Sequence, residues 1–356
     1  MRYESHKTNE LAADDIAKWA ALQAADPRLA SPFLRPEFSQ WLGDVRDDTR
    51  VVVLREGDVA VGFFPYGKSG AAVHPAGTPL SLCQAVVAES GCCWDGLELL
   101  RATGSHRLTF DQWIPDQEEA TLFCGVDVHC PYVDLSQGFD AYLASKRAQG
   151  SDLFKDVGRK SRKLARTHGA VRCELIQDPQ VIEQLIQWKS AQCERTQVAD
   201  LFRFRWPTEL IRASIMHATD ACGGLMWGLY AGQQPIALTL VLRSYAYAHG
   251  WVMAFDEQYS QFSPGMILLH EVLQDLPTRG ITRLDMGKGV YGYKRRIMSG
   301  TTSVREGIID GRPLRRAAWT KWLQTRNWLR HSEYRPLAHR ANRVISNIRW
   351  LWGSNY

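Results

Sequence analysis

Apolar positions in the first part of the chain change from helical to strand spacing. Residues 11–45 carry apolar side chains at helical spacing, and Pro27 and Pro32 interrupt them, which predicts two short helices. Residues 51–66 form two apolar runs around the turn sequence Glu-Gly-Asp, which predicts a β-hairpin. A Gly/Pro-rich loop should follow, and then strands at 107–110 and 132–135. We therefore expect an α+β arrangement with a mixed or antiparallel sheet.

The second part of the chain has a different order of apolar patterns. It begins with two helices, the second of them basic and amphipathic over 152–171, and continues with a strand and two further helices. Three β-branched and aromatic runs then predict an antiparallel meander, followed by one helix and one strand. The predicted bounds are 139–149 for the first helix, 171–176 for the first strand, 179–195 and 207–218 for the next helices, 224–256 for the meander, 266–276 for the last helix and 281–287 for the last strand.

Length and composition favour a two-domain protein of the reducing cytosol. A chain of 356 residues with 45% hydrophobic and 23% charged residues is long enough for two hydrophobic cores. The first thirty residues lack the apolar core of a signal peptide, and no apolar run is long enough to span a bilayer. The eight cysteines show neither CxxC pairs nor zinc-ligand spacing. We expect a cytoplasmic protein with free thiols and no bound metal.

Charge is distributed unevenly along the chain. Residues 312–356 contain ten Lys or Arg and one acid, whereas residues 1–311 contain 33 bases and 37 acids. The C-terminal segment therefore carries a net charge of +9 on a mildly acidic protein. Such an asymmetry predicts an anionic partner for the tail, either a phospholipid surface or nucleic acid. No base-reading module is visible, so a specific nucleic-acid partner is the least favoured of these.

Three sequence motifs occur in an order that resembles one family. They are WKSAQCERTQVADLF, FDEQYSQFSPGMILLHEVL and LDMGKGVYGYKRR, at 188–202, 255–273 and 284–296. Together they resemble the CelD/BcsL-type acetyltransferases of exopolysaccharide synthesis, which belong to the acyl-CoA N-acyltransferase (GNAT) superfamily and are related to the FemABX aminoacyltransferases. The resemblance is clear over about 150–300 and fainter before it. It implies tandem GNAT-like domains, a degenerate one at 1–150 and an active one at 151–311, with a basic helical tail at 312–356.

The segment around 263–266 is a candidate site for the acyl donor. A strand that ends near Asp256, a short polar loop and a helix N-terminus should leave backbone N–H groups that bind phosphate. The resemblance implies acetyl-CoA or another acyl-CoA as the donor. One glycine here replaces the Q/RxxGxG/A pattern of most GNAT loops, so an altered donor, no donor at all, or an ordinary capped helix remains an alternative. The residues expected at the donor are Val252, Ala254, Tyr259, Ser263, Pro264, Gly265 and Met266.

Asp285 is the first candidate for the catalytic base, and Asp256 is the second. Asp285 lies between apolar neighbours at the end of a strand, and a buried carboxylate is a stronger base unless it is paired. Lys294 or Arg295 is the expected partner, and a structural ion pair is the alternative. Acyl transfer also needs an oxyanion donor, expected from a strand N–H near 252–254, and an acid for the thiolate. Tyr291 and Tyr293 could supply that acid with help from Lys294, or could merely anchor the loop.

The acceptor side is expected on the helix at 179–195. Lys189, Gln192 and Thr196 share one face of that helix, and Arg195 lies beside them. These groups could hydrogen-bond a sugar or its diphosphate, although a solvated face explains the pattern almost as well. The basic helix at 152–171 is either a solvated connector or a rim that attracts phosphate. His249 and His270 are interpreted as core or surface residues.

The tail predicts two amphipathic helices separated near Ser332–Pro336. Mixed Trp, Leu and Arg are typical of a helix lying in a membrane interface, so residues 313–356 are expected to hold the protein at the inner face of the cytoplasmic membrane. A hairpin packed on the protein's own body, or across a homodimer, is the alternative.

The sequence leads to one main functional expectation and two alternatives. The main one is an acyltransferase that acts on an amino sugar or hydroxyl of a lipid-linked or other cell-envelope saccharide precursor. The alternatives are a FemABX-like enzyme that uses aminoacyl-tRNA, and a non-catalytic GNAT-fold protein that senses a nucleotide or scaffolds a polysaccharide synthase.

Overall fold

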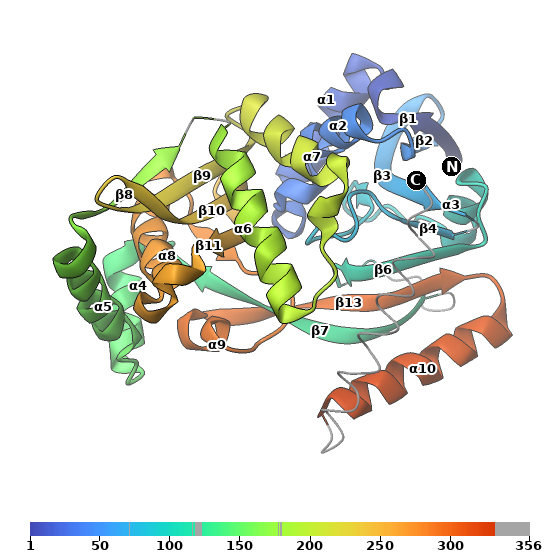
Figure 1. Cartoon of the computed structure of the whole chain (residues 1–356). Helices are drawn as coiled ribbons and strands as arrows, with labels where there is room; N and C mark the ends of the chain where they lie inside the picture. The colour runs from blue at the N-terminus through green and yellow to red at the C-terminus, as the bar shows by residue number, and fades with distance from the viewer. Residues whose placement is uncertain (71, 116, 118–122, 177, 179, 332–356) are drawn as a thin grey trace. The chain divides into compact units, whose positions relative to one another are not determined.

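The computed structural model in Figure 1 describes residues 1–70, 72–115, 117, 123–176, 178 and 180–331. The chain divides into two compact units. Unit 1 comprises Met1–Val128, Gln197–Ala199 and the chain from Ser303 onward, and unit 2 comprises His129–Thr196 and Asp200–Thr302. The predicted domain boundaries at 150/151 and 311/312 differ from this division. The second half of β7 (Phe123–Asp134) and all of α4 (Gly138–Ala148) cluster with the second unit, and most of β13 (Gly300–Asp310) clusters with the first.

Unit 1 is built on a mixed sheet in the order β1-β2-β3-β4-β6-β13. All neighbours in it are antiparallel except β4 and β6, and the short β5 pairs with β3. The predicted helices and hairpin are present; β4 lies inside the segment expected to be a loop, and β1, α3 and β13 were not predicted. The elements are β1 (Arg2–Lys7), α1 (Ala13–Ala25), α2 (Pro36–Val45), β2 (Thr49–Glu56), β3 (Val59–Ser69), β4 (Ala72–Pro75), β5 (Val87–Ala88), α3 (Gly96–Ala102), β6 (Arg107–Trp113), β13 (Gly300–Asp310) and α10 (Pro313–His331).

Unit 2 carries the strand order β7-β12-β11-β10-β9-β8. Strands β8 to β11 are antiparallel neighbours, as the meander predicted, and β12 joins β11 in parallel. The elements are β7 (Phe123–Asp134), α4 (Gly138–Ala148), α5 (Leu153–His168), β8 (Val171–Ile176), α6 (Gln180–Thr196), α7 (Arg205–Met216), β9 (Cys222–Ala231), β10 (Gln234–Ser244), β11 (Tyr247–Phe255), α8 (Pro264–Asp275), β12 (Arg283–Asp285) and α9 (Tyr293–Ile297). These elements confirm the predicted α+β class with a mixed sheet.

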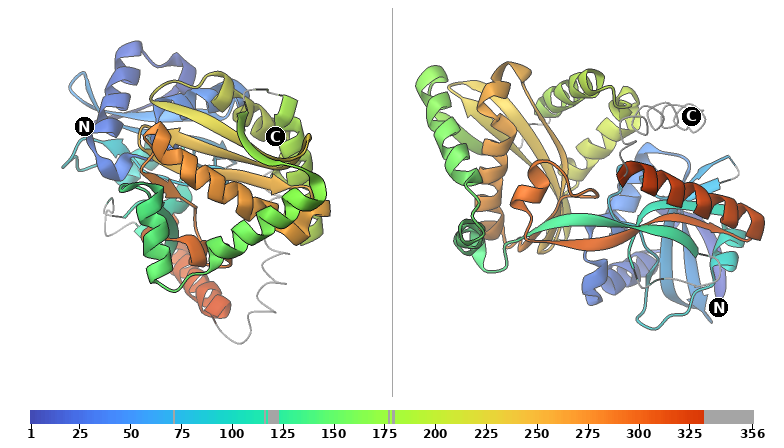
Figure 2. Two further views of the ribbon diagram at one scale, coloured as in Figure 1. Left: turned by 90° about the vertical axis from the view of Figure 1, so that its left-hand side faces the viewer. Right: turned by 90° about the horizontal axis from the view of Figure 1, so that it is seen from below.

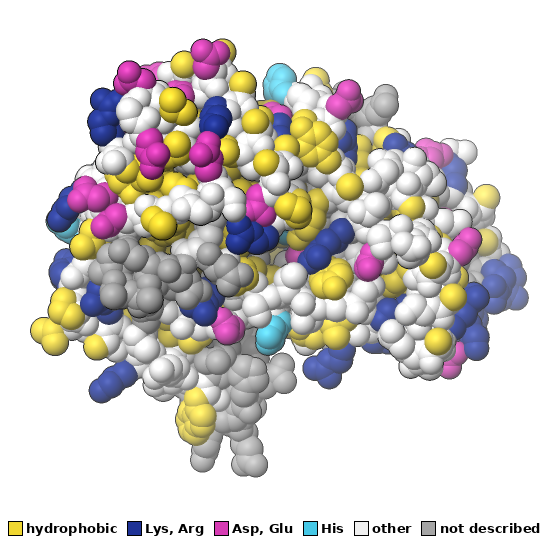
Figure 3. Space-filling model, turned by 180° about the vertical axis from the view of Figure 1, so that it is seen from behind, with side chains coloured by type: hydrophobic (Ala, Val, Ile, Leu, Met, Phe, Trp, Pro, Cys, Tyr) yellow, Lys and Arg dark blue, Asp and Glu magenta, His cyan; other side chains and the backbone are white. Residues whose placement is uncertain are grey.

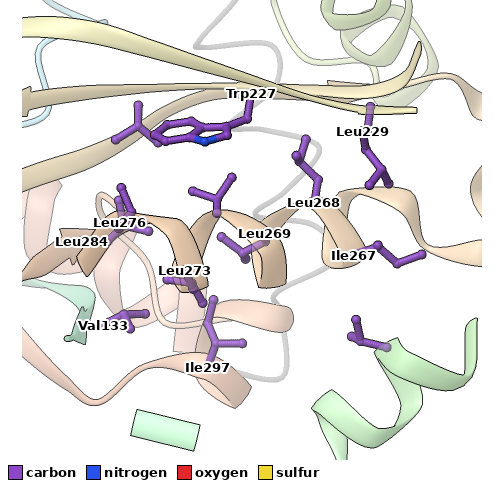
Figure 4. Close-up of a cluster of buried hydrophobic side chains, with 14 of the residues drawn as sticks. Val133, Trp227, Leu229, Ile267, Leu268, Leu269, Leu273, Leu276, Leu284 and Ile297 are labelled. Carbon is purple, nitrogen blue, oxygen red and sulfur yellow. The ribbon is translucent and has the colours of Figure 1, made fainter. Parts of the chain in front are cut away.

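Helices cover both faces of the unit 2 sheet. Figure 2 shows, in its right-hand view, α5 and α8 on one side of the strands and α6 and α7 on the other. The α8 side holds the larger core, in which Leu268 and Leu273 meet Trp227 and Leu284, as Figure 4 shows. Ile182 and Leu185 of α6 belong to the opposite core. Burying the apolar stripe of each helix on one sheet face fixes which strand residues each helix can reach.

Helix α10 packs on unit 1. Leu323 is 1% exposed, Arg326 forms an ion pair with Glu306 at 2.7 Å, and Arg316 donates to the Asp310 carbonyl at 3.2 Å. The first predicted tail helix is therefore present and packs on the protein's own body. The second one, expected after Pro336, lies outside the described residues.

Candidate active site

The side chains of strand β11 switch between the two faces of the sheet halfway along the strand. Leu240 of β10 pairs with Val252 and Val241 pairs with Gly250, so Trp251 is an inserted residue, a β-bulge. Ala248 faces the α8 core, whereas Val252 and Ala254 belong to the α6 core. The bulge thus reverses the alternation of side chains between the two ends of one strand.

The C-terminal half of β11 has an open edge. Strand β12 pairs with β11 only at residues 247–249, while β11 continues to Phe255. The Asp256 N–H binds the Ile236 carbonyl of β10 at 2.9 Å. Alternation along the strand therefore directs the Val252 and Ala254 amides to β10 and the Met253 and Phe255 amides away from it. An extended ligand could add to this edge as a further strand, using Met253 and Phe255 rather than the residues named from the sequence.

Helix α6 brings the predicted acceptor residues to that edge. Lys189 Nζ donates to the Met253 carbonyl at 3.4 Å and to Gln192 Oε1 at 2.9 Å. Burial lowers the pKa of Lys189, while the nearby Cys193 has its pKa raised by burial. Thr196 is less involved, because its hydroxyl donates to the Gln192 carbonyl within the helix. Lys189 is thus the predicted acceptor residue that reaches β11, and Gln192 is bound to Lys189.

The N-terminus of α8 offers fewer free amides than the sequence suggested. Ser263 adopts φ 54° and ψ 56°, and its carbonyl accepts from the Met266 and Ile267 N–H groups. Pro264 has no N–H, which leaves Gly265 as the amide of the first turn without such a bond. Gly265 is buried, and a Cβ there would lie 3.3 Å from Met253 Sδ and 3.6 Å from Phe255. The expected cluster of phosphate-binding amides is therefore reduced to one.

A lysine from α5 lies at the same turn. Lys160 Nζ lies 2.7 Å from Ser263 Oγ, and Lys163 Nζ lies 5.8 Å from the Phe262 ring. Figure 3 shows dark-blue Lys and Arg side chains gathered toward its right-hand edge, and Lys155, Arg159, Arg162, Lys163 and Arg166 of α5 are exposed. A cation beside the positive end of the α8 dipole makes this turn attractive to phosphate.

Asp285 is buried at the point where β11 and β12 separate. Its side chain is 4% exposed, Oδ1 accepts from the Gly287 N–H at 2.7 Å, and Oδ2 accepts from the Tyr247 hydroxyl at 3.3 Å. His249 is its register partner, with Nδ1 at 3.5 Å from Oδ1. The expectation that Lys294 or Arg295 pairs with this carboxylate is wrong, since Lys294 Nζ donates to the Met286 carbonyl at 2.6 Å and Arg295 is exposed.

His249 stays neutral in this position. Burial lowers its pKa to about 4, against the opposing influence of the Asp285 charge. A neutral imidazole can lie beside a carboxylate without forming a full ion pair. Because Leu284 and Ala248 face the α8 core, strand alternation places Asp285 and His249 on the other face of the sheet.

The loop after β12 carries Lys294 and two tyrosines. Tyr291 and Tyr293 are 62% and 43% exposed, and Lys294 Nζ lies 5.5 Å from the Tyr291 ring centre. Burial lowers the pKa of Lys294, with the Cys130 thiol and Asp285 acting in the opposite direction. The Tyr142 hydroxyl ties the end of α9 down by donating to the Ile297 carbonyl at 2.6 Å. Two phenols thus stay accessible on an anchored loop.

The remaining predicted residues have structural contacts near the site. Asp256 caps the 3-10 helix η5 (Glu257–Phe262) by accepting from the Gln258 N–H at 3.0 Å. Tyr259 stacks edge-on against His168 at 5.0 Å between ring centres, and Arg195 pairs with Glu257 at 2.8 Å. These contacts favour Asp285 over Asp256 as the base.

Sequence reasoning missed Tyr247, His249 and the role of Lys160. The two β11 residues become neighbours of Asp285 through a parallel pairing between strands 36 residues apart. A signal existed, because matching the YAYAH run to the RLD run in parallel register would have paired His249 with Asp285. Lys160 was noted only as part of a basic face.

Comparison with protein families supports the assignment of the second half of the chain. Residues 151–295 match the model of the Acetyltransferase (GNAT) domain, the CelD-type family. No curated protein matches the chain.

Solved structures share the fold over most of the chain at low identity. The C-terminal DUF2156 domain of a protein described as a putative lysylphosphatidylglycerol synthetase from Agrobacterium fabrum is 14% identical with a TM-score of 0.55, covering 89% of this chain and 97% of that one. L-PGS from Bacillus licheniformis is 12% identical with a TM-score of 0.53, covering 88% of this chain and 97% of that one. FemX is 10% identical with a TM-score of 0.52, covering 86% of this chain and 96% of that one. The predicted fold, α+β and tandem GNAT-like, is thereby confirmed.

Proposed function

We propose, on the premise that residues 151–295 form a GNAT-fold acetyltransferase domain, that the chain transfers an acyl group from coenzyme A to an amino or hydroxyl group of a cell-envelope or exopolysaccharide precursor. The observation that carries this proposal is the open edge of β11. It runs from the α8 N-terminus, where Lys160 lies, toward Asp285 at the point where β11 and β12 separate. An acyl-CoA has a phosphate end, an extended amide arm and a reactive carbonyl, which suit these three places.

Donor binding uses backbone and cationic groups. The Met253 and Phe255 amides would hydrogen-bond the extended amide arm, in the manner of an added strand. Lys160, Ser263 and the Gly265 N–H would hold the pyrophosphate. Gly265 suits this role, because a larger side chain would press on Met253 and Phe255. Acetyl-CoA, when bound, supplies the thioester carbonyl.

Proton transfer falls to Asp285 and the tyrosine loop. The Asp285 carboxylate accepts the proton of the acceptor amine or hydroxyl as the new C–N or C–O bond forms. The carbonyl oxygen gains negative charge at this moment, and a β11 N–H directed away from β10 would donate to it. The C–S bond then breaks, and Tyr291 or Tyr293 gives its proton to the leaving thiolate. Both tyrosines are accessible enough to recover a proton from solvent.

The acceptor would lie next to α6. Lys189 and Gln192 hold a hydrogen-bonded pair at the β11 edge, and such groups bind sugar hydroxyls and phosphates. The exposed side of α10 supports a membrane location for this acceptor, because Arg315, Lys321 and Trp328 are exposed there. Among the described residues, no helix is long and apolar enough to cross a bilayer. The proposed association is therefore with the surface of an anionic membrane.

A second candidate is aminoacyl transfer from aminoacyl-tRNA. The single amide at Gly265 favours it, because a pyrophosphate is normally held by several N–H groups. FemX and the lysylphosphatidylglycerol synthetases share the fold at 10–14% identity, which carries no substrate information.

Donor-dependent stabilisation tests the two candidates directly. Thermal unfolding of the full chain would be followed with acetyl-CoA, longer acyl-CoAs, free coenzyme A, and charged or uncharged tRNA. A ligand that binds the folded state raises the midpoint with its concentration. We expect acetyl-CoA to raise it, and amino sugars to release coenzyme A thiol in a thiol assay. A shift with charged tRNA but none with any acyl-CoA would replace the first candidate by the second.

A further inference from the structure

Arg283 occupies an unusual position two residues before Asp285. Its guanidinium carbon lies 3.8 Å from the centre of the Tyr132 ring and 5.3 Å from that of the Tyr247 ring. Tyr132 pairs with Asp285 across β7 and β12, and Tyr247 pairs with Arg283 across β11 and β12. The two rings hold the planar cation in one orientation on the face of the sheet that carries Asp285.

Within the described part of the chain, the Arg283 guanidinium donates no hydrogen bond, and only the backbone N–H of this residue does, to the Ala246 carbonyl. Its Nε is buried there without an acceptor. Both neighbouring carboxylates are engaged by backbone amides, Asp134 by the Ser136 N–H at 2.9 Å and Asp285 by the Gly287 N–H at 2.7 Å. The pKa of Asp134 is lowered mainly by its hydrogen bonds with Ser136, and the positive charge of Arg283 lowers it further.

Such an arrangement is costly unless a ligand completes it. A buried donor without an acceptor loses the free energy of its hydrogen bond to water, and the loss is greater when the donor is charged. The ligand that best satisfies a fixed guanidinium is an anion with two oxygens in one plane, a carboxylate or a phosphate, because it can accept two parallel hydrogen bonds. A neutral hydroxyl accepts from one N–H at a time.

We propose that Arg283, held between Tyr132 and Tyr247, binds an anionic group of the acceptor, a phosphate or carboxylate, and so selects negatively charged acceptors. Residues two apart on a strand point to the same face of the sheet, so the anion would lie on the face that carries Asp285. This inference rests on the proposed acyl transfer for its acceptor, although the anion site itself stands on the geometry of Arg283.

Acceptor discrimination provides the test. The full chain would be assayed with acetyl-CoA and three acceptors, namely glucosamine, glucosamine 6-phosphate and muramic acid, which carries a carboxylate. We expect kcat/KM to be at least about tenfold higher for one of the charged sugars than for glucosamine, the size of one charge-assisted hydrogen bond. The charged sugar with the higher kcat/KM shows whether the site prefers a phosphate or a carboxylate.

Variants of Arg283 test whether this residue causes the preference for charged acceptors. Arg283→Gln should remove the preference, so that the same variant gives equal kcat/KM for the charged acceptor and for glucosamine. Arg283→Lys keeps the charge but not the planar fork, and should recover only part of the preference. The matched control is Arg279→Lys, an exposed arginine in the turn before β12 that pairs with Asp275 at 2.6 Å; it should keep the full preference.

Direct binding separates failure of this inference from failure of the proposed function. If no acceptor is acetylated, calorimetric titration with glucosamine 6-phosphate and inorganic phosphate still reports on the site. Saturable binding that Arg283→Gln abolishes, with an unchanged thermal midpoint, would support the anion site alone. Equal binding, or equal acceptor preference, in the native chain and Arg283→Gln would overturn it.

Discussion

Asp285 is the residue on which the proposed chemistry depends, and its surroundings resemble those of a working base more than those of a structural ion pair. It is buried, it receives two hydrogen bonds from Gly287 and Tyr247, and no lysine or arginine neutralises it by an ion pair among the described residues. A carboxylate held this way keeps its orientation and can still accept a proton.

Replacing this carboxylate should remove base catalysis without unfolding the chain. Asp285→Asn keeps the shape and loses the base, so we expect kcat for acetyl transfer to fall by about 10²-fold or more, while acetyl-CoA still raises the thermal midpoint. Glu194→Gln, on the exposed surface of α6, serves as a charge-matched control. Undiminished turnover by Asp285→Asn would remove Asp285 from the mechanism.

His249 makes stability depend on pH. Its pKa is about 4 in the folded chain and near the ordinary 6.5 when unfolded, so the unfolded state binds more protons between these values. The contribution is fully present above pH 6.5 and is lost as the pH falls toward 4, up to about 3 kcal/mol. Denaturant unfolding at pH 7.5 and pH 5 should show this loss.

Two variants isolate the histidine responsible. His249→Gln should flatten the pH dependence between 7.5 and 5, and His106→Gln, on an exposed residue, should keep it. Burial also lowers the pKa of His74, so a smaller slope of the same sign should remain in His249→Gln. A full slope in His249→Gln would show that His249 does not titrate in this range.

At the residue scale, the sequence predicted single candidate residues but not the neighbours that surround them in the structure. Asp285 and Lys189 were predicted from local pattern and resemblance, because both occur in recognisable motifs. Tyr247, His249 and Tyr132 reach the same sheet face through strand pairing, which depends on register over long separations. One inserted residue, Trp251, reverses the facing of half a strand, and nothing local in the sequence marks it.

Among the elements, hydrophobic periodicity predicted α6, α8 and β8 to β10 to within a few residues. It overestimated β12, expected at 281–287 and observed at Arg283–Asp285. Because β12 is short, the C-terminal half of β11 has an open edge. The length of β12 depends on where it diverges from β11 rather than on the strand propensity of residues 281–287. The start of α8 was also located correctly, but Ser263 uses the amides that were expected to bind phosphate.

The approach of α5 to the α8 N-terminus gives a prediction at this scale. Lys160→Ala should raise KM for acetyl-CoA by about tenfold, because it removes the cation beside Ser263, and should leave kcat nearly unchanged. Acetyl-pantetheine, which lacks the pyrophosphate, should react equally with both proteins. Lys155→Ala, an exposed lysine on the same helix, is the matched control. An unchanged KM in Lys160→Ala would place the phosphates elsewhere.

For the whole molecule, the sequence indicated two domains, and the structure has two compact units that are not contiguous in sequence. Composition cannot reveal that β13 and α10 join the unit that contains the N-terminus. A late strand that pairs with strands from the start of the chain leaves no change in composition at that point. The tail was the least determined part, since one pattern of Trp, Leu and Arg is compatible with both a membrane surface and the protein's own body.

In the structure, α10 packs on unit 1 and still has exposed residues that could contact a membrane surface. Leu323 and the Arg326–Glu306 ion pair fix the helix to unit 1, while Arg315, Lys321 and Trp328 are exposed to solvent. Because the whole segment from 312 carries a net charge of +9 on a body of net −4, an anionic surface should attract this end of the chain first. Each basic residue near such a surface contributes about 1 kcal/mol.

Vesicle sedimentation tests this orientation. The full chain should bind phosphatidylglycerol vesicles more than phosphatidylcholine vesicles at low salt, and lose the excess as salt shortens the screening length to about 10 Å at 0.1 M. Reversing two charges, Arg315→Glu with Lys321→Glu, should weaken binding at least about tenfold, whereas Arg101→Glu on the exposed surface of α3 should not. A chain ending at His331 separates α10 from the residues after it. If neither the double variant nor that truncation reduced binding to anionic vesicles, the C-terminal segment would have no part in membrane association, and α10 would serve unit 1 alone.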